Sequence, residues 1–230
     1  MPALDEEAAI GLVLAALPPG HVDHVVVADN GSTDRTAEVA RAHGALVVHE
    51  PRRGYGAACL AGLAACRALP GGPPDVVVFL DADFSDVPDD LPLVLAPVLA
   101  GAADLVIGSR MLLPASRRAL LPQARHGNAL AVTLIRALWG ARFTDLGPFR
   151  AVTWAALEAV GMTDRDFGWT VELQLKAAAR GLRCVEVPVR YRARVGTSKI
   201  TGTLSGTVRA GAKILYTIGR HALTTPPRRP

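Results

Sequence analysis

The chain has 230 residues, half of them apolar and 20% charged, a composition that excludes a disordered protein and suits one α/β domain. Its three cysteines, Cys59, Cys66 and Cys184, form no CxxC pair, so we expect structural thiols in a reducing cytoplasm rather than disulfides or a thiolate metal site. No apolar run reaches the ~18–20 residues of a membrane span. We therefore predict a cytoplasmic protein whose membrane contact, at the inner face, is peripheral at most.

Charge is distributed unevenly along the chain. Residues 1–179 carry 14 Lys and Arg against 20 Asp and Glu, whereas residues 180–230 carry 11 against a single acid, Glu186. A basic C-terminal segment indicates an anionic partner. Because the segment has no nucleic-acid motif and only Tyr191 and Tyr216 to stack on bases, we expect a phosphate-bearing or membrane-bound partner and no nucleic acid.

Strands and helices are expected to alternate along the first half. The pattern predicts a helix at 5–17, a strand at 25–28, a helix capped by Ser32 or Thr33 and ending near His43, a strand at 45–49, a helix at 54–67, a strand at 76–80, a helix near 89–100 and a strand at 105–108. Further on, we expect a helix at 169–180 and a strand at 185–189. This order favours a mostly parallel sheet with helices on both faces.

Polar residues follow three of these strands. Asp29 follows the first, Asp81 and Asp83 the third, and Arg110 the fourth. In such a sheet, ligands bind beyond the carboxyl ends of the strands. Two carboxylates one residue apart can hold one Mg²⁺ or Mn²⁺ ion on a nucleotide diphosphate, although the pattern is weak in isolation.

Other acidic residues nearby have simpler interpretations. We expect Asp86, Asp89 and Asp90 in a solvated turn and at a helix N-terminus, which favours negative charge. Asp29 has two compatible interpretations: it begins a strand–turn–helix connection, and it can accept hydrogen bonds from a nucleobase.

The spaced motifs together resemble a known family. Those of the first half are similar to family 2 glycosyltransferases of GT-A fold: 2–7 (PALDEE), 29–34 (DNGSTD), 54–56 (GYG) and 81–83 (DAD). Later segments resemble dolichyl and polyprenyl-phosphate hexose synthases: 108–110 (GSR), 125–128 (RHGN), 147–150 (GPFR), 168–172 (GWTVE), 187–189 (VPV) and 194–199 (RVGTSK). The resemblance runs in order from Pro2 to about Thr207. It implies a GT-A, Rossmann-like α/β fold.

The resemblance also implies roles for individual residues. Implied donor-binding residues are Pro2, Leu4, Glu6, Asp29, Asp81 and Ala82, with Asp29 reading the base. Asp81 and Asp83 would bind the divalent ion. Implied residues around the acceptor phosphate are Arg110, Arg125, Arg194, Ser198 and Lys199. Arginine forks match phosphate geometry, while plain surface charge is the alternative for any single one.

Glu172 is expected, with Asp83, among the catalytic residues. A structural salt bridge is its default role on a helix, and the resemblance places it near the sugar or an acceptor-site arginine. A hydroxyl acceptor would need a general base, whereas a phosphate acceptor is already anionic and needs none. We favour positioning.

Two features lie at the ends of the chain. The family has an apolar strand before the motif at 2–7, and Met1-Pro2 leaves no room for it, so we expect the true start codon upstream. We assign residues 1–200 to the catalytic domain and 201–230 to a basic tail. Its helix, at 203–221, either lies on anionic lipid or packs its apolar stripe on the domain.

These observations predict an inverting, metal-dependent transfer of a hexose from a UDP- or GDP-sugar to polyprenyl phosphate. The alternatives are transfer to a hydroxyl acceptor, such as a small metabolite or glycan, and nucleotide-sugar binding without catalysis.

Overall fold

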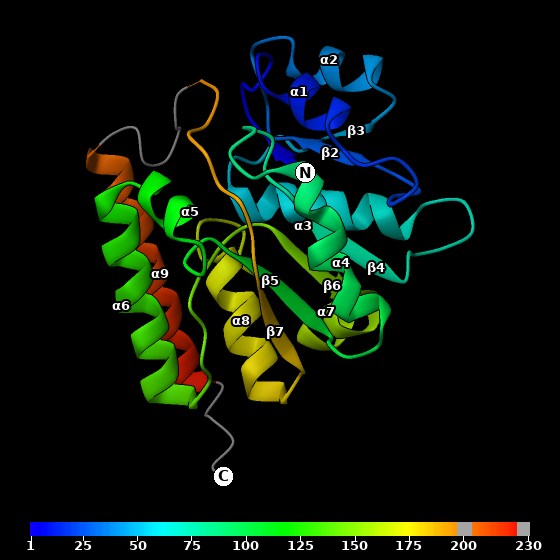
Figure 1. Ribbon diagram of the computed structural model, residues 1–230. Coiled ribbons are helices and arrows are strands. Elements are labelled where there is room, and N and C mark those ends of the chain that lie inside the picture. Colours follow the sequence, from blue (N-terminus) through cyan, green and yellow to red (C-terminus); the bar gives the residue numbers. More distant parts are fainter. Residues whose placement is uncertain (197–203, 225–230) are drawn as a thin grey trace.

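The computed structural model describes residues 1–196 and 204–224 as two small sheets with helices packed around them (Figure 1). The elements are β1 (Pro2–Ala3), α1 (Ile10–Ala15), β2 (Val26–Asp29), α2 (Thr36–Ala42), β3 (Leu46–His49), α3 (Tyr55–Arg67), β4 (Val76–Phe79), a 3₁₀ turn (Pro88–Asp90), α4 (Leu91–Leu99), β5 (Leu105–Ser109), α5 (Pro114–Ala119), α6 (Pro122–Trp139), β6 (Arg150–Thr153), α7 (Trp154–Val160), α8 (Trp169–Arg180), β7 (Cys184–Pro188) and α9 (Leu204–Thr224).

The first sheet is parallel and has the order β1-β2-β3. Its register pairs Ala3 with Asp29 and Asp29 with His49. The carboxyl ends of all three strands therefore meet at one edge. Asp29 lies at that edge, as the sequence predicts.

The second sheet has the order β4-β6-β5-β7. β6, which the sequence analysis did not predict, runs antiparallel to both β4 and β5, whereas β5 and β7 are parallel. The α/β fold is thus confirmed, with β6 as the exception to its parallel strands.

The two helices of the first sheet begin later than predicted. The segment at 5–9 forms a loop before α1, and α2 begins at Thr36 without a cap from Ser32 or Thr33. The Ser32 hydroxyl instead accepts from the Asp5 N–H at 2.9 Å, and Asp34 Oδ1 accepts from the Thr36 N–H at 2.9 Å. The predicted cap was wrong because these side chains tie two loops together.

A cavity of about 490 Å³ lies between the two sheets. Among the described residues, no strand pairs β1 with β4. The cavity lining is mostly apolar and includes Met1, Val26, Ala58, Cys59, Gly62, Val77, Phe79, Leu91 and Leu95. That a strand precedes Met1 stays a prediction.

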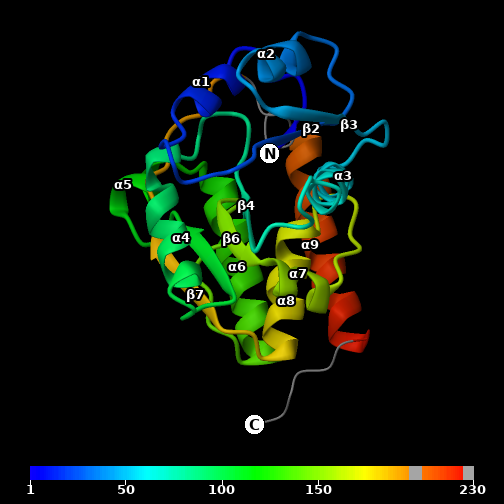
Figure 2. The same cartoon turned by 90° about the vertical axis from the view of Figure 1, so that its right-hand side faces the viewer.

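The tail helix α9 packs on the domain beside α6 and α8 (Figures 1 and 2). Thr217, Ile218 and His221 are buried there, so this part of the packing interpretation is confirmed. Its other face leaves Val208 62% and Leu223 87% exposed. No helix in the described ranges is both long and apolar enough to span a bilayer.

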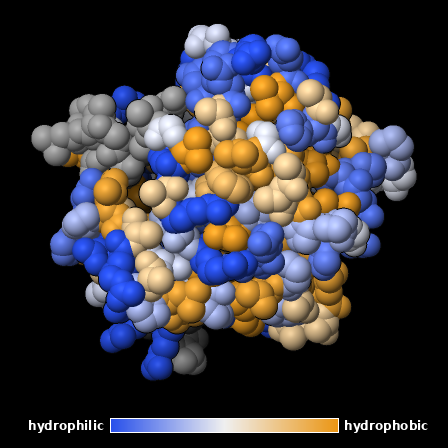
Figure 3. Space-filling model, turned by 45° about the horizontal axis from the view of Figure 1, so that its top comes forward, coloured by the Kyte–Doolittle hydropathy of each residue, from blue (hydrophilic) through white to orange (hydrophobic). Residues whose placement is uncertain are grey.

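The face in Figure 3 carries polar and apolar residues side by side. Scattered apolar residues are normal on a protein surface. This view therefore supplies no evidence for a binding surface, and the candidate site is defined by the buried polar residues at the strand ends.

Candidate active site

Asp29 ends β2 and is 6% exposed. Its Oδ1 accepts from the Ser32 N–H at 3.1 Å, and its Oδ2 lies 3.2 Å from His49 Nδ1. Burial alone would raise the pKa of Asp29, but the hydrogen bonds from Ser32 and His49 hold it below its ordinary value. Asp29 is therefore an ionised hydrogen-bond acceptor at neutral pH.

The loop after β1 is bound to the loop after β2 by side chains. Asp5 Oδ1 accepts from the Thr33 N–H at 2.7 Å, and the Glu6 N–H donates to Thr36 Oγ1 at 2.7 Å. Asn30, which is buried, donates to the carbonyl of Arg52 at 2.7 Å. Polar cross-links thus fix the shape of this edge.

The expected metal motif, residues 81–83 (DAD), follows β4. Asp81 Oδ1 accepts from the Tyr55 hydroxyl at 3.0 Å, and Asp83 Oδ1 accepts from the Ser85 N–H at 2.9 Å. Burial, followed by repulsion from Asp83, raises the pKa of Asp81 to about 6. The negative charge of Asp83 that raises the proton affinity of Asp81 would also attract a metal cation.

Arg194 supplies the positive charge at this edge in the structure. Its guanidinium contacts Asp83 Oδ2 at 3.1 Å and also pairs with Glu6. We expected Arg194 beside the acceptor phosphate, whereas here it bridges two residues of the expected donor side. No local pattern predicts this pairing, because Glu6 and Arg194 lie 188 positions apart.

Asp86 corrects a prediction. It was expected in a solvated turn, yet it is 1% exposed, and neither carboxylate oxygen has a hydrogen-bond partner among the described residues. Burial, with Asp81 as the next cause, raises its pKa well above the ordinary value. A backbone bridge to Tyr191 covers it with the segment that follows β7, and this contact is not visible in the local sequence.

Arg110 follows β5 and is held by Asp145, a residue that sequence reasoning missed. Its Nε and Nη2 donate to the two Asp145 oxygens, both at 2.8 Å, and its guanidinium lies 5.1 Å from the centre of the Tyr191 ring. Asp145 is fully buried, and although burial raises its pKa, Arg110 lowers it below the ordinary value. The pair fixes one guanidinium near the end of β5.

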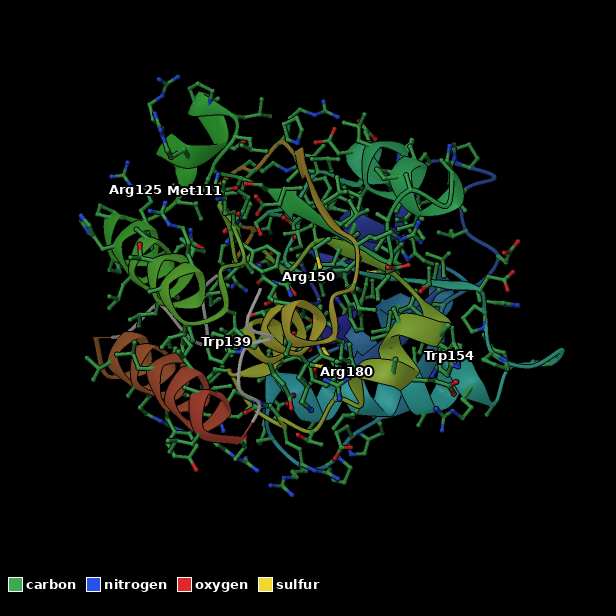
Figure 4. All side chains as sticks on the ribbon, turned by 90° about the horizontal axis from the view of Figure 1, so that it is seen from below. Met111, Arg125, Trp139, Arg150, Trp154 and Arg180 are labelled. Carbon is green, nitrogen blue, oxygen red and sulfur yellow. The ribbon has the colours of Figure 1, made fainter. Side chains whose placement is uncertain are left out.

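Arg150 is buried inside the second sheet, in the middle of the view in Figure 4. It donates to the carbonyls of Gly147 and Thr170 and to Gln174 Oε1, at 2.6–2.8 Å. The family motif at 147–150 therefore has a structural arginine, with three acceptors to offset its desolvation.

Glu172, on α8, lies in an internal hydrogen-bond network. Its carboxylate accepts from the Thr163 hydroxyl at 2.6 Å and the Asp164 N–H at 2.7 Å, and pairs with Lys176 at 2.7 Å. It is 1% exposed, and although burial raises its pKa, bonds from Lys176 and Thr163 lower it overall. These contacts are those of a structural residue, the default interpretation for this helix.

The segment at 163–166 connects Glu172 with the metal motif. A Cβ on Gly54 would lie 2.1 Å from the Arg165 carbonyl oxygen, and one on Gly56 would lie 2.2 Å from that of Asp164. Only glycine permits this approach to the start of α3. Tyr55 lies between the two glycines, and its hydroxyl meets Asp81. The motif at 54–56 thus positions the Tyr55 hydroxyl against Asp81.

The remaining predicted residues are placed as follows. Pro2 lies in β1 and Leu4 just after it, while Ala82 is buried between the two carboxylates. Arg125 lies in the first turn of α6, at the edge of the view in Figure 4. Ser198 and Lys199 lie outside the described residues.

Asp81 and Asp83 fit a divalent ion whose remaining ligands come from a bound substrate. Within the described ranges, no group of three or more His, Cys, Asp or Glu residues could hold a metal by itself. Asp81 and Asp83 are two hard oxygen ligands, and a cationic side chain already contacts one of them. Mg²⁺ and Mn²⁺ suit such a site when substrate phosphates complete their coordination.

Comparison with known proteins identifies a family. The sequence model described as glycosyl transferase family 2 matches residues 1–149. An uncharacterised glycosyltransferase of Mycobacterium tuberculosis is 40% identical, over 90% of this chain and 91% of its own length. A dolichyl-phosphate hexose transferase of Haloferax volcanii is 35% identical, over 87% of this chain and 84% of its own. An undecaprenyl-phosphate mannosyltransferase of Micrococcus luteus is 34% identical, over 79% and 77%.

A solved structure gives the same result for the fold. Glucosyl-3-phosphoglycerate synthase from Mycobacterium tuberculosis, in complex with Mn²⁺, UDP-glucose and phosphoglyceric acid, has a TM-score of 0.71 and 27% identity. The comparison covers 95% of this chain and 78% of that one.

Proposed function

The chain belongs to glycosyl transferase family 2, and we propose that it transfers a hexose from a nucleotide sugar to polyprenyl phosphate, with Mg²⁺ or Mn²⁺ and with inversion. Two relatives at 34–35% identity carry names that specify a polyprenyl-type phosphate acceptor. UDP-glucose in a structural neighbour supports a nucleotide-sugar donor.

The environment of Glu172 is our reason for proposing a phosphate rather than a hydroxyl acceptor. A hydroxyl acceptor must lose a proton, and acting as that base is the alternative to the positioning role favoured for Glu172. Its carboxylate is instead surrounded by Thr163, Asp164 and Lys176 and is 1% exposed. A phosphate acceptor requires no base, so it fits a site in which Glu172 only positions the segment at 163–166.

The proposed transfer forms one bond and breaks one bond, and it needs no proton transfer. A phosphate oxygen of the acceptor attacks C1 of the hexose, the bond from C1 to the diphosphate breaks, and the nucleoside diphosphate leaves with that electron pair. Attack opposite the leaving group inverts C1. Asp29 would hold the base, while Asp81 and Asp83 would hold a divalent ion that, when bound, stabilises the charge of the leaving diphosphate.

Arg110 is the described residue best prepared for the acceptor phosphate. Asp145 fixes its orientation and Tyr191 stacks on it, so little conformational freedom remains to be lost on binding. Arg125 and Lys199 join it in this proposal.

The outer face of α9 supports contact with the lipid surface that carries such an acceptor. Val208, Leu215 and Leu223 are exposed on that face, next to the exposed Arg209 and Arg220. Apolar residues flanked by basic ones are typical of helices that lie on anionic membranes. We propose that this face rests on anionic lipid while Thr217 and Ile218 face the domain.

A second candidate is transfer to a hydroxyl group of a small phosphorylated acid. It is favoured by the solved synthase, whose structures contain phosphoglyceric acid or glycerol 3-phosphate. Arg110 could hold the phosphate of either acceptor, so only the nucleophile distinguishes the two functions.

A product assay tests these proposals. The purified protein is incubated with Mn²⁺ and labelled UDP-glucose or GDP-mannose, together with undecaprenyl phosphate in detergent, with 3-phosphoglycerate, or with neither. We expect organic-extractable label only with the lipid phosphate, and an inverted anomeric centre in its NMR spectrum. Label on phosphoglycerate alone would refute the lipid acceptor, and hydrolysis without transfer would refute both.

The membrane contact is tested separately. In flotation with vesicles containing phosphatidylglycerol, we expect the protein to float and the Leu215→Asp/Leu223→Asp variant to remain at the bottom. Equal flotation of the two proteins would refute the α9 surface.

A further inference from the structure

Arg194 is attached to the metal motif by its backbone as well as its side chain. The Val195 N–H donates to the Asp83 carbonyl at 3.0 Å, and the Arg192 N–H donates to the Ser85 carbonyl at 3.0 Å. The segment after β7 therefore runs alongside residues 83–86. This pairing places the Arg194 side chain beside Asp83.

Its guanidinium joins two carboxylates that come from different sheets. Glu6 follows β1 of the first sheet, and Asp83 follows β4 of the second. Arg194 pairs with both, and all three side chains are mostly buried, with 24%, 10% and 12% exposed for Arg194, Glu6 and Asp83. Mostly buried ion pairs are screened by salt less than surface pairs.

We propose that Arg194 is a built-in counter-cation, which competes with the divalent ion for Asp83 and turns to the donor diphosphate once that ion and nucleotide bind. The proposal rests on the metal and donor site of the proposed function, and it places Arg194 on the donor side rather than the acceptor side. It makes Arg194 a determinant of when the metal binds.

Electrostatics explains why a cation is needed there. Asp81 and Asp86 add two more carboxyl groups to this edge near Asp83, and like charges so close together repel one another. Removing Arg194 would leave Glu6 and Asp83 without this shared partner. Their attraction for Mn²⁺ would then increase.

The other arginines near the motif are engaged elsewhere. Arg110 is bound by Asp145, and Arg192 donates to the Phe84 carbonyl at 2.8 Å with its guanidinium 3.5 Å from the centre of the Phe84 ring. Arg194 keeps one donor in reserve, since its buried Nε has no hydrogen-bond partner among the described residues. A diphosphate oxygen is the kind of acceptor that such a donor fits.

Linkage sets a clear expectation. If Arg194 and the metal compete for Asp83, then metal alone binds weakly, and nucleotide strengthens its binding by giving the guanidinium a new partner. Without the guanidinium, the metal alone should bind more tightly. Bound metal should then increase the affinity for nucleotide less than it does in the wild type.

The test measures Mn²⁺ binding by electron paramagnetic resonance, with and without UDP, in the wild type and in Arg194→Ala. Arg190→Ala is the matched control, because it removes the same charge from an exposed arginine that pairs with Asp89 and Asp90. Loss of one charge-assisted contact predicts a dissociation constant for Mn²⁺ alone that is about tenfold lower in Arg194→Ala and unchanged in the control. UDP affinity in saturating Mn²⁺ should fall about tenfold in Arg194→Ala.

Each other outcome has a definite meaning. If Arg194→Ala binds Mn²⁺ no more tightly than the wild type, the competition is refuted. If UDP affinity is unchanged while the KM for polyprenyl phosphate rises, Arg194 belongs to the acceptor site as first expected. If the wild type binds no Mn²⁺ even with UDP, the metal site itself fails, and this proposal fails with it. The Arg194→Lys variant keeps the charge, so it should lie between the wild type and Arg194→Ala if charge causes the effect.

Discussion

The two sheets of the molecule are stabilised in different ways. The core beside β1–β3 is small and rich in alanine, with Ala3, Ile10, Val27, Ala40, Ala45 and Ala82. The largest core packs against the second sheet and includes Phe79, Ile135, Trp154, Trp169 and Leu173. Polar cross-links between loops, such as those of Asp5 and Asn30, complete the first region.

This difference shows how the site is assembled. The edge of the first sheet where Asp29 lies has few large side chains, so hydrogen-bonded loops give it its shape. The second sheet supplies a rigid support for Asp83 and Arg110. Glu6 and Asp83 are linked where the two regions join, through Arg194. Substitutions should therefore separate function, which depends on the junction, from stability, which depends on the larger core.

The largest effect is expected from Asp83→Ala. Loss of a metal ligand removes charge stabilisation of the leaving diphosphate, so we expect at least about a thousandfold fall in kcat/KM. Hexose transfer is measured with excess Mn²⁺. Asp89→Ala, whose side chain is 66% exposed, is the control and should retain wild-type activity. Unchanged activity in EDTA, or in Asp83→Ala, would contradict the metal assignment.

Breaking a buried pair in the second region should reduce stability most. Asp145→Ala leaves Arg110, whose side chain is 14% exposed, without its carboxylate. Removing one partner of a buried pair costs about 3 kcal/mol or more in free energy of unfolding. Glu158→Ala breaks the exposed pair with Arg67 and should cost less than about 1 kcal/mol. Urea unfolding compares the two variants, and equal losses would show that Asp145 is not a structural partner.

The metal motif should destabilise the metal-free protein above pH 6. Folding raises the pKa of Asp81 from 3.8 to about 6. The folded state therefore binds this proton more tightly, and the stability that protonation provides is lost as the pH rises through that range. Asp81→Asn should add on the order of 2 kcal/mol at pH 8 and nothing at pH 3.5. Thermal melts in EDTA measure this, and an equal shift at both pH values would contradict the cause.

Sequence patterns predicted the elements that depend on residues close together in the sequence. The helix carrying Glu172 was predicted to end at Arg180, and α8 does so, with Gly168 and Gly181 at its two cap positions. β6 was missed because it begins with Arg150, whose acceptors at Thr170 and Gln174 lie 20 and 24 positions away. A charged residue at the start of four residues gives no strand signal until its distant partners are known.

The site was predictable in its carboxylates but not in their partners. Asp29, Asp81 and Asp83 follow strands, and that position can be read from the sequence. The burial of Asp86 and the pairing of Arg194 depend on the segment after β7 lying along residues 83–86. Contacts between segments about 100 positions apart are set by topology, which no local pattern encodes.

The smallest effect should come from joining the two sheets. The cavity between them is bordered by Val26 and Val77, and the Met1 ammonium is buried beside it, donating to the Val26 carbonyl at 2.8 Å. Burial lowers the pKa of that ammonium, so its charge is costly, and a peptide N–H in its place could make the same hydrogen bond without charge.

We therefore expect that five apolar residues added before Met1, the length of an ordinary strand, will stabilise the protein. Burial of their side chains, less the entropy of ordering them, should add about 1–2 kcal/mol, or about 3–6 °C in Tm. Slower amide exchange at Val76 and Val78, whose N–H groups face away from β6, would show that the new strand pairs with the free edge of β4. A matched extension of Ser, Gly and Asp should change neither quantity. If both extensions change Tm and amide exchange equally, the cavity does not accept a strand, and the two sheets stay separate in the folded protein.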